Sequence, residues 1–213
     1  FEKTSSDAMF LEAATDVLSR KLDTQAAPQF LYALTNFNHG PHDIARTAPG
    51  RFEAQRAFAY ASLPDAQYAE YYARLSETAA TWRAMKERLA SRHPDRPMLI
   101  LHYGDHQPVM VRRIQKHLRR SDLVARQFRT FYAIETLNMD EGALTSGQGA
   151  DLDIACLSTL VLQLAGLPLD EIYATRASLF EECGAGYFLS TSERKRQFHR
   201  TLVDAGLIKL EAS

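Results

Sequence analysis

The sequence predicts an α/β fold with a mainly parallel sheet. Two kinds of segment alternate along the chain: short continuous apolar runs, and longer stretches whose apolar residues recur at steps of three and four. The short runs suit strands that are covered on both faces, and the longer stretches suit amphipathic helices. Strands that alternate with helices of this length indicate a sheet layered with helices. We find no internal repeat or linker, so a single domain over residues 1–213 is expected.

Six stretches predict helices because their apolar residues share one face. The first can be capped by Asp7, and the second carries a stripe of aromatic residues that includes Tyr68, Tyr71 and Trp82. The third is strongly basic. In chain order, the expected helices are residues 7–22, 66–90, 109–120, 151–165, 169–182 and 192–205.

Three apolar or β-branched runs predict strands, and a fourth, shorter run predicts an edge strand. Segments rich in Asn, His, Gly and Pro separate them and predict loops, notably over residues 36–49 and 142–149. In chain order, the expected strands are residues 29–35, 98–103, 128–137 and 186–190.

The composition excludes several classes of protein. The formal net charge of −1 gives no reason to expect binding to nucleic acid or to an anionic membrane surface. No run reaches the roughly 20 consecutive apolar residues that span a bilayer. The two cysteines, Cys156 and Cys183, match no zinc-binding spacing. A buried inert thiol at Cys156 and a disulfide between the two cysteines both remain open.

Two loops carry the residues best suited to chemistry. The first is Asn36-Phe37-Asn38-His39-Gly40-Pro41-His42-Asp43, after the apolar run 29–35. The second is His102-Tyr103-Gly104-Asp105-His106-Gln107-Pro108, at the end of the run 98–103. In open parallel sheets, ligands bind beyond the carboxyl ends of the strands. We therefore expect the side chains of the two loops to converge at one edge of the sheet.

A carboxylate next to an imidazole offers one oxygen and one nitrogen ligand, which suits zinc or manganese. Asp105 and His106 are therefore candidate metal ligands, and His39 and His42 could donate hydrogen bonds to an anion or bind metal. The alternative interpretation is an ordinary turn at Asp105 with a hydrogen-bonded surface histidine, and loop histidines that pack on their neighbours.

The first loop resembles the loop that follows an inner strand in sulfatases and in membrane-anchored phosphoethanolamine and phosphoglycerol transferases. The stretch His102-Tyr103-Gly104-Asp105-His106-Gln107-Pro108 resembles the metal-binding loop of the same superfamily. The order and separation of the two loops also fit, as does the intervening helix around residues 71–78. The resemblance runs from about residue 7 to about residue 190.

This resemblance implies an alkaline-phosphatase-like layered sandwich, of which the chain would be only the latter part. Asp105 and His106 would hold one divalent metal ion (Zn, Mn, Mg or Ca), and His39 would contact the phosphate or sulfate of the substrate. In the family, the nucleophile and an acidic metal ligand lie well upstream. We therefore expect no catalytic nucleophile in this chain and expect the portion that carries it to be absent.

The resemblance implies a metal-dependent enzyme domain that acts on phosphate or sulfate esters of small molecules, lipids or glycans, by hydrolysis or by transfer of a phosphoethanolamine- or phosphoglycerol-type group. It also implies an extracytoplasmic location, with a membrane anchor that is absent from this chain. An alternative function is a non-catalytic α/β module whose His39 loop binds an anionic glycan or a protein partner. A third is a purely structural domain.

Overall fold

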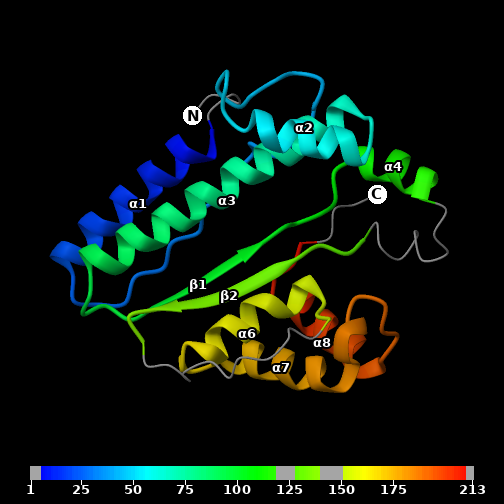
Figure 1. Ribbon diagram of the computed structural model, residues 1–213. Coiled ribbons are helices and arrows are strands. Elements are labelled where there is room, and N and C mark those ends of the chain that lie inside the picture. Colours follow the sequence, from blue (N-terminus) through cyan, green and yellow to red (C-terminus); the bar gives the residue numbers. More distant parts are fainter. Residues whose placement is uncertain (1–5, 119–127, 140–150, 210–213) are drawn as a thin grey trace. The chain divides into compact units, whose positions relative to one another are not determined.

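The computed structural model describes residues 6–118, 128–139 and 151–209 (Figure 1). The described residues contain helices and a small sheet, so the α/β class is confirmed. They divide into two compact units: residues 6–118, 128–133 and 137–139 belong to the first, and residues 134–136 and 151–209 to the second. The single domain expected over residues 1–213 remains a prediction.

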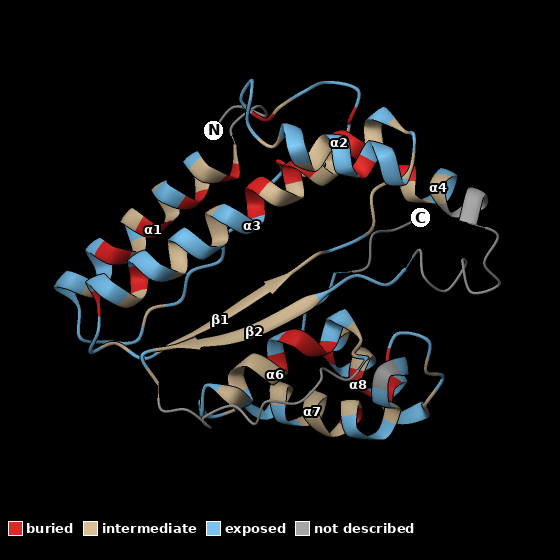
Figure 2. Ribbon diagram, viewed as in Figure 1, coloured by how far each residue is buried: buried red, intermediate tan, exposed pale blue. Residues whose placement is uncertain are grey.

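The first unit is built on two long helices, α1 (Asp7–Thr24) and α3 (Ala66–Arg92), which pack side by side and run in the same direction (Figure 1). Both confirm helices expected from the sequence. Buried residues lie on each helix, whereas α3 carries exposed and half-exposed residues on its other side (Figure 2).

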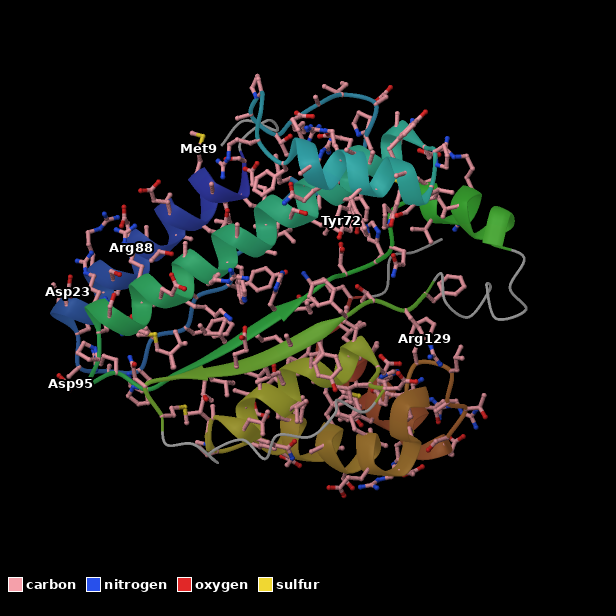
Figure 3. All side chains as sticks on the ribbon, in the orientation of Figure 1. Met9, Asp23, Tyr72, Arg88, Asp95 and Arg129 are labelled. Carbon is pink, nitrogen blue, oxygen red and sulfur yellow. The ribbon has the colours of Figure 1, made fainter. Side chains whose placement is uncertain are left out.

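Charged pairs join the exposed flanks of α1 and α3. Arg88 donates to Asp16 at 2.5 Å, and Arg92 donates to Asp23 at 2.7 Å. Figure 3 shows Arg88 and Asp23 on these flanks. The later residue of α1 pairs with the later residue of α3, as expected for two helices that run in the same direction.

The cap of α1 differs from the one expected. The hydroxyl of Ser6 accepts from the backbone N–H of Met9 at 3.4 Å, so Ser6 is the N-cap residue. Asp7 lies one position later and is buried, where its carboxylate accepts a hydrogen bond from Thr78 on α3. The acidic residue therefore ties α1 to α3 instead of capping the helix.

The sequence did not predict helix α2 (Glu53–Ser62), which packs on α3. Its buried residue is Ala59, whereas Phe58 and Tyr60 are exposed. A helix that approaches its neighbour through an alanine lacks the stripe of large apolar residues by which amphipathic helices are recognised.

The sheet of the described residues consists of β1 (Met98–Tyr103) and β2 (Tyr132–Leu137). The N–H of Gly104, just after β1, donates to the carbonyl of Phe131, just before β2. At the other end, Asn138 reaches the carbonyl of Arg96. The two strands are therefore antiparallel, which differs from the parallel pairing expected. A parallel pair would need a crossover that returns to the same end of the sheet, and here β2 starts where β1 ends.

The strand predicted over 29–35 is wrong, because the residues form no strand in the structure. Phe30 is 89% exposed, and Leu31, Tyr32 and Leu34 are exposed as well. A strand of this composition needs a neighbouring strand for its backbone and cover for both faces. Within the described ranges, β1 and β2 pair only with each other, so the run has neither.

The second unit packs three helices, which confirm three of the expected ones: α6 (Leu157–Leu164), α7 (Glu171–Cys183) and α8 (Glu193–Asp204). Its core is formed by the buried side chains of Cys156, Leu179, Tyr187, Phe198 and Leu202. Both cysteines are free.

The edge strand predicted over 186–190 is wrong. The chain forms a short 3₁₀ helix, Gly184–Gly186, followed by a turn. The buried ammonium group of Lys195 on α8 donates to the carbonyls of Tyr187, Phe188 and Ser190, the last two at 2.8 and 3.1 Å. Because these three carbonyls accept from one ammonium group, the segment forms a turn instead of pairing with a strand.

Helix α4 (Met110–Leu118) confirms the basic helix expected over 109–120, as far as the described residues extend. The loop predicted over 142–149 lies outside the described residues. Among the helices that the structure describes, none combines the length and the apolar character needed to cross a membrane.

Candidate functional site

The loop that carries His39 is anchored to α3 by a buried arginine. Arg74 is 0% exposed, and its guanidinium donates to the backbone carbonyls of Phe37 (3.2 Å), His39 (3.1 Å), Pro41 (3.0 Å) and Ile44 (2.7 Å). The fifth N–H, on Nε, donates to Glu70 at 2.8 Å. A guanidinium has five N–H donors, so every one of them has a partner.

Glu70 completes this anchor one helical turn earlier on α3. Its carboxylate accepts from Arg74, from the backbone N–H of Arg46 (2.9 Å) and from Arg56 on α2 (2.8 and 3.0 Å). Burial alone would raise the pKa of Glu70, but these hydrogen bonds and the charge of Arg56 lower it below its ordinary value. Arg56 also contacts Thr47 and Glu53, and so the far end of the loop is held as well.

A second contact fixes the loop beside His39. The side-chain amide of Asn38 donates to the hydroxyl of Thr78 at 2.8 Å, and that hydroxyl donates to the buried Asp7 at 2.6 Å. Burial raises the pKa of Asp7, while the hydrogen bond from Thr78 acts in the opposite direction. The loop is thus attached to α3 on both sides of His39.

His42 is buried within the same loop. Its Nε2 lies 3.0 Å from the carbonyl of Asn38, and its ring meets the ring of Tyr71 edge to face at 5.2 Å. A carbonyl only accepts, so Nε2 carries a proton. Burial lowers the pKa of His42, and the charge of Arg74 lowers it further. His42 therefore supports the loop as a neutral ring.

His39, in contrast, is exposed. Its Nδ1 lies 2.9 Å from the carbonyl of Gly40 and must donate to it. The neutral ring then presents the lone pair of Nε2 to the surroundings, and the protonated ring presents a second N–H. In either form, the ring is oriented by the backbone of its own loop.

The second loop begins where β1 ends and presents Asp105 and His106. One carboxylate oxygen of Asp105 accepts from the backbone N–H of His106 at 2.8 Å. His106 Nδ1 donates to the carbonyl of Gln107 at 3.0 Å, so the neutral ring keeps its lone pair on Nε2. This nitrogen lies 3.4 Å from the other carboxylate oxygen of Asp105.

Gly104 lets this loop lie close to the segment that leads into β2. A Cβ at this position would overlap with the hydroxyl of Thr130. The side chain of Gln107 also reaches this segment and donates to the carbonyl of Arg129 at 2.5 Å; Figure 3 labels Arg129. Steric overlap with Thr130 therefore explains why a glycine precedes Asp105.

The two loops meet, as their predicted convergence requires. The rings of His39 and His106 lie edge to face, with centroids 6.5 Å apart. The predicted metal ligands and the predicted substrate contact therefore share one exposed surface of the first unit. Their roles remain predictions.

The donor atoms at this surface fit part of a divalent metal site. Two ligand atoms on one tetrahedral ion with bonds of ~2.1 Å stand about 3.4 Å apart, and Asp105 Oδ2 and His106 Nε2 have this separation. Without a proton, the two atoms are both electron-pair donors, so a cation between them would satisfy both. Over the described ranges, however, no group of three or more His, Cys, Asp or Glu side chains gathers around one point. The pair therefore supplies two ligands.

The polar residues of α3 that hold the first loop, Glu70, Arg74 and Thr78, were not predicted from the sequence. The aromatic stripe of this helix is the more conspicuous pattern, but its members Tyr68, Tyr71 and Trp82 are only half-buried. The missed residues recur at steps of four, the spacing that marks one helix face. A polar stripe at this spacing could have indicated a buried hydrogen-bond network.

Comparison with protein families gives one finding. The family model described as Sulfatase matches residues 2–133, which is more than half of the chain and includes both loops. Comparison with curated proteins and with solved structures gives no match.

Proposed function

Because the chain belongs to the sulfatase family, we propose that it is a metal-dependent enzyme domain for phosphate or sulfate esters in which Asp105 and His106 hold the metal and His39 contacts the ester. The family supports a sulfatase-like enzyme that acts on such esters, and it is typically metal-dependent. The observation that carries the residue roles is the meeting of His39 with His106 at 6.5 Å.

Asp105 Oδ2 and His106 Nε2 would be the two metal ligands from this loop. A bound divalent ion would polarise an oxygen of the phosphoryl or sulfuryl group. The loop suits this role because His106 Nδ1 and Asp105 Oδ1 already bond to backbone groups, which fixes the orientation of both side chains.

His39 would contact the ester from the first loop, beside the metal ligands of the second loop. In its protonated form, it would donate from Nε2 to an anionic oxygen of the ester; in its neutral form, it would accept from a hydroxyl of the substrate. The bond from Nδ1 to the carbonyl of Gly40 holds the ring in place for either contact.

The proposal extends to the reaction type and to the location. The resemblance to membrane-anchored transferases supports transfer of a phosphoethanolamine- or phosphoglycerol-type group to an acceptor hydroxyl, beside simple hydrolysis. It also supports an extracytoplasmic location. We assign no nucleophile within this chain.

Metal content tests the proposal. Wild type, Asp105→Asn and the control Asp95→Asn, each prepared as the complete protein, are dialysed against Zn²⁺ or Mn²⁺, freed of excess ion and subjected to elemental analysis. Asparagine keeps an oxygen for the N–H of His106 but loses the charge that a metal requires. Asp95 is exposed and lies outside both loops. We expect metal in wild type and Asp95→Asn, and loss of metal in Asp105→Asn; equal metal content in all three would contradict the assignment.

A further inference from the structure

The strongest unassigned feature of the first unit is the buried guanidinium of Arg74. It lies beneath the His39 loop, fully excluded from water, and four of its five donors go to the carbonyls of that loop. These four hydrogen bonds run from the side chain to backbone carbonyls that lie outside any helix or strand, so they hold the loop in place.

We infer that Arg74 is a positioning residue that sets the orientation of the His39 ring towards His106. The inference rests on the proposed function in one respect, which is that His39 contacts the ester. Arg74 is itself buried and contacts His39 through the backbone carbonyl, and so it would act through the backbone of the loop.

The path from Arg74 to the His39 ring is short. Arg74 Nη1 donates to the carbonyl of His39 itself, at 3.1 Å, and Nη2 donates to the carbonyl of Pro41, at 3.0 Å. Between these two carbonyls lies the carbonyl of Gly40, which accepts from the His39 ring at 2.9 Å. The peptide groups that Arg74 holds therefore flank the one that orients the ring.

Lysine cannot replace this function. Its single ammonium nitrogen carries three donors at one point, whereas the guanidinium spreads five donors over a rigid plane. Four carbonyls and the carboxylate of Glu70 lie around that plane. An Arg74→Lys variant keeps the positive charge next to Glu70 but leaves several of the carbonyls without a donor.

The chain offers a matched control on the same helix. Arg88 is also on α3 and is also paired with an aspartate, Asp16, but it is partly exposed and contacts α1 instead of the loop. Arg88→Lys therefore makes the same chemical change without touching the His39 loop.

The first measurement is NMR of histidine-labelled protein. We expect Arg74→Lys to shift the ring signals of His39 and to weaken cross-relaxation between the His39 and His106 rings, and Arg88→Lys to leave both unchanged. The signals of His199, in the second unit, serve as an internal reference. An unchanged His39–His106 contact in folded Arg74→Lys would overturn the inference, whether or not the protein turns over any ester.

The second measurement is a double-mutant cycle on turnover of para-nitrophenyl sulfate and bis(para-nitrophenyl) phosphate by the complete protein. A misplaced contact residue can cost about 100-fold in rate, and we expect a loss of this order in kcat/KM for Arg74→Lys. If Arg74 acts through His39, the double variant with His39→Ala loses no more activity than His39→Ala alone. Additive losses would show that Arg74 acts in another way and would overturn the inference.

If Arg74→Lys does not fold, Glu70→Asp replaces it. The Glu70 carboxylate accepts from Arg74 Nε at 2.8 Å, and the shorter aspartate keeps the charge but withdraws this support from the guanidinium. We expect the His39 ring signals to shift and the His39–His106 cross-relaxation to weaken in the same assay. Unchanged signals in folded Glu70→Asp would overturn the inference. If wild type turns over neither ester, the proposed function fails, and the NMR measurement alone decides the role of Arg74.

Discussion

The rings of His39 and His106 meet edge to face, although they come from loops that lie far apart in the sequence. Each ring is oriented by its own backbone, because Nδ1 of His39 bonds to Gly40 and Nδ1 of His106 bonds to Gln107. Both Nε2 atoms are thus left for ligands. A single bound anion or metal–anion pair can be contacted by both loops, which is the basis of the first prediction.

We expect His39→Ala in the complete protein to lower ester turnover while the metal stays bound. Loss of one hydrogen-bond donor to a transferred group costs about 100-fold in kcat, and His39 belongs to a different loop from the two metal ligands. Steady-state kinetics and elemental analysis of the same preparations check both parts. His199→Ala, in the second unit, is the control and should retain wild-type turnover. If metal disappears together with activity, His39 is a ligand and its proposed role is wrong.

Gly104→Ala should destabilise the first unit, because its Cβ would overlap with the hydroxyl of Thr130. Overpacking of this kind costs about 1–3 kcal/mol. Chemical denaturation measures the change in the free energy of unfolding. Gly186→Ala is the matched control, since its Cβ would meet no atom within 4 Å. Equal stability of the two variants would show that the approach of Gly104 to Thr130 is not restrictive.

Glu70→Gln should destabilise the protein near neutral pH, because it leaves the buried Arg74 without a counter-charge. Removing one partner of a buried ion pair costs about 3–5 kcal/mol. Glu53→Gln is the control: Glu53 pairs with Arg56 at 2.6 Å but is exposed, and exposed pairs contribute about 0–1 kcal/mol. If Glu70→Gln costs no more than Glu53→Gln, the network does not stabilise the fold.

The same pair of variants carries a pH dependence. The pKa of Glu70 in the folded protein lies below its ordinary value of 4.5, because its hydrogen bonds outweigh the effect of burial. The stability that ionised Glu70 contributes is therefore complete above the ordinary value and is lost as the pH falls through the folded pKa. We expect the difference between wild type and Glu70→Gln to shrink below pH 4.5 in thermal unfolding curves. A difference that stays constant into the acid range would contradict this.

Cys156 should be unreactive in the native protein. Burial, together with the negative charge of Asp153, raises the pKa of its thiol to about 12. Only the thiolate reacts with alkylating reagents, so very little of Cys156 is available near neutral pH. We expect iodoacetamide to modify the half-buried Cys183 first and Cys156 only in denaturant, as measured by peptide mass spectrometry. Equal native rates for the two thiols would contradict the prediction.

Helices that present large apolar residues at regular spacing were predictable from the sequence, as α1, α3, α7 and α8 show. The strands β1 and β2 were also predictable from their apolar and β-branched runs. Helix α2 was not, because it approaches α3 through Ala59. The run over 29–35 has the composition of a buried strand, but whether it pairs depends on partners that are distant in the sequence.

The positions of the candidate site residues were predictable, and the means by which they are held were not. His39, Asp105 and His106 follow from short motifs at the ends of apolar runs, and the structure brings His39 and His106 together. Arg74 is a charged residue in the middle of a helix, and such residues are usually exposed. Its burial depends on carbonyls that only the folded loop supplies.

Because Arg74 and Glu70 are buried, salt should weaken their ion pair less than it weakens exposed ion pairs. Dissolved ions screen charges that face the solvent, over a distance of about 8 Å in physiological saline, and the Arg88–Asp16 pair on the flank of α1 is of this kind. Counterions have no access to the guanidinium beneath the loop. At high salt concentration, the packing of α1 on α3 should therefore weaken before the conformation of the His39 loop changes.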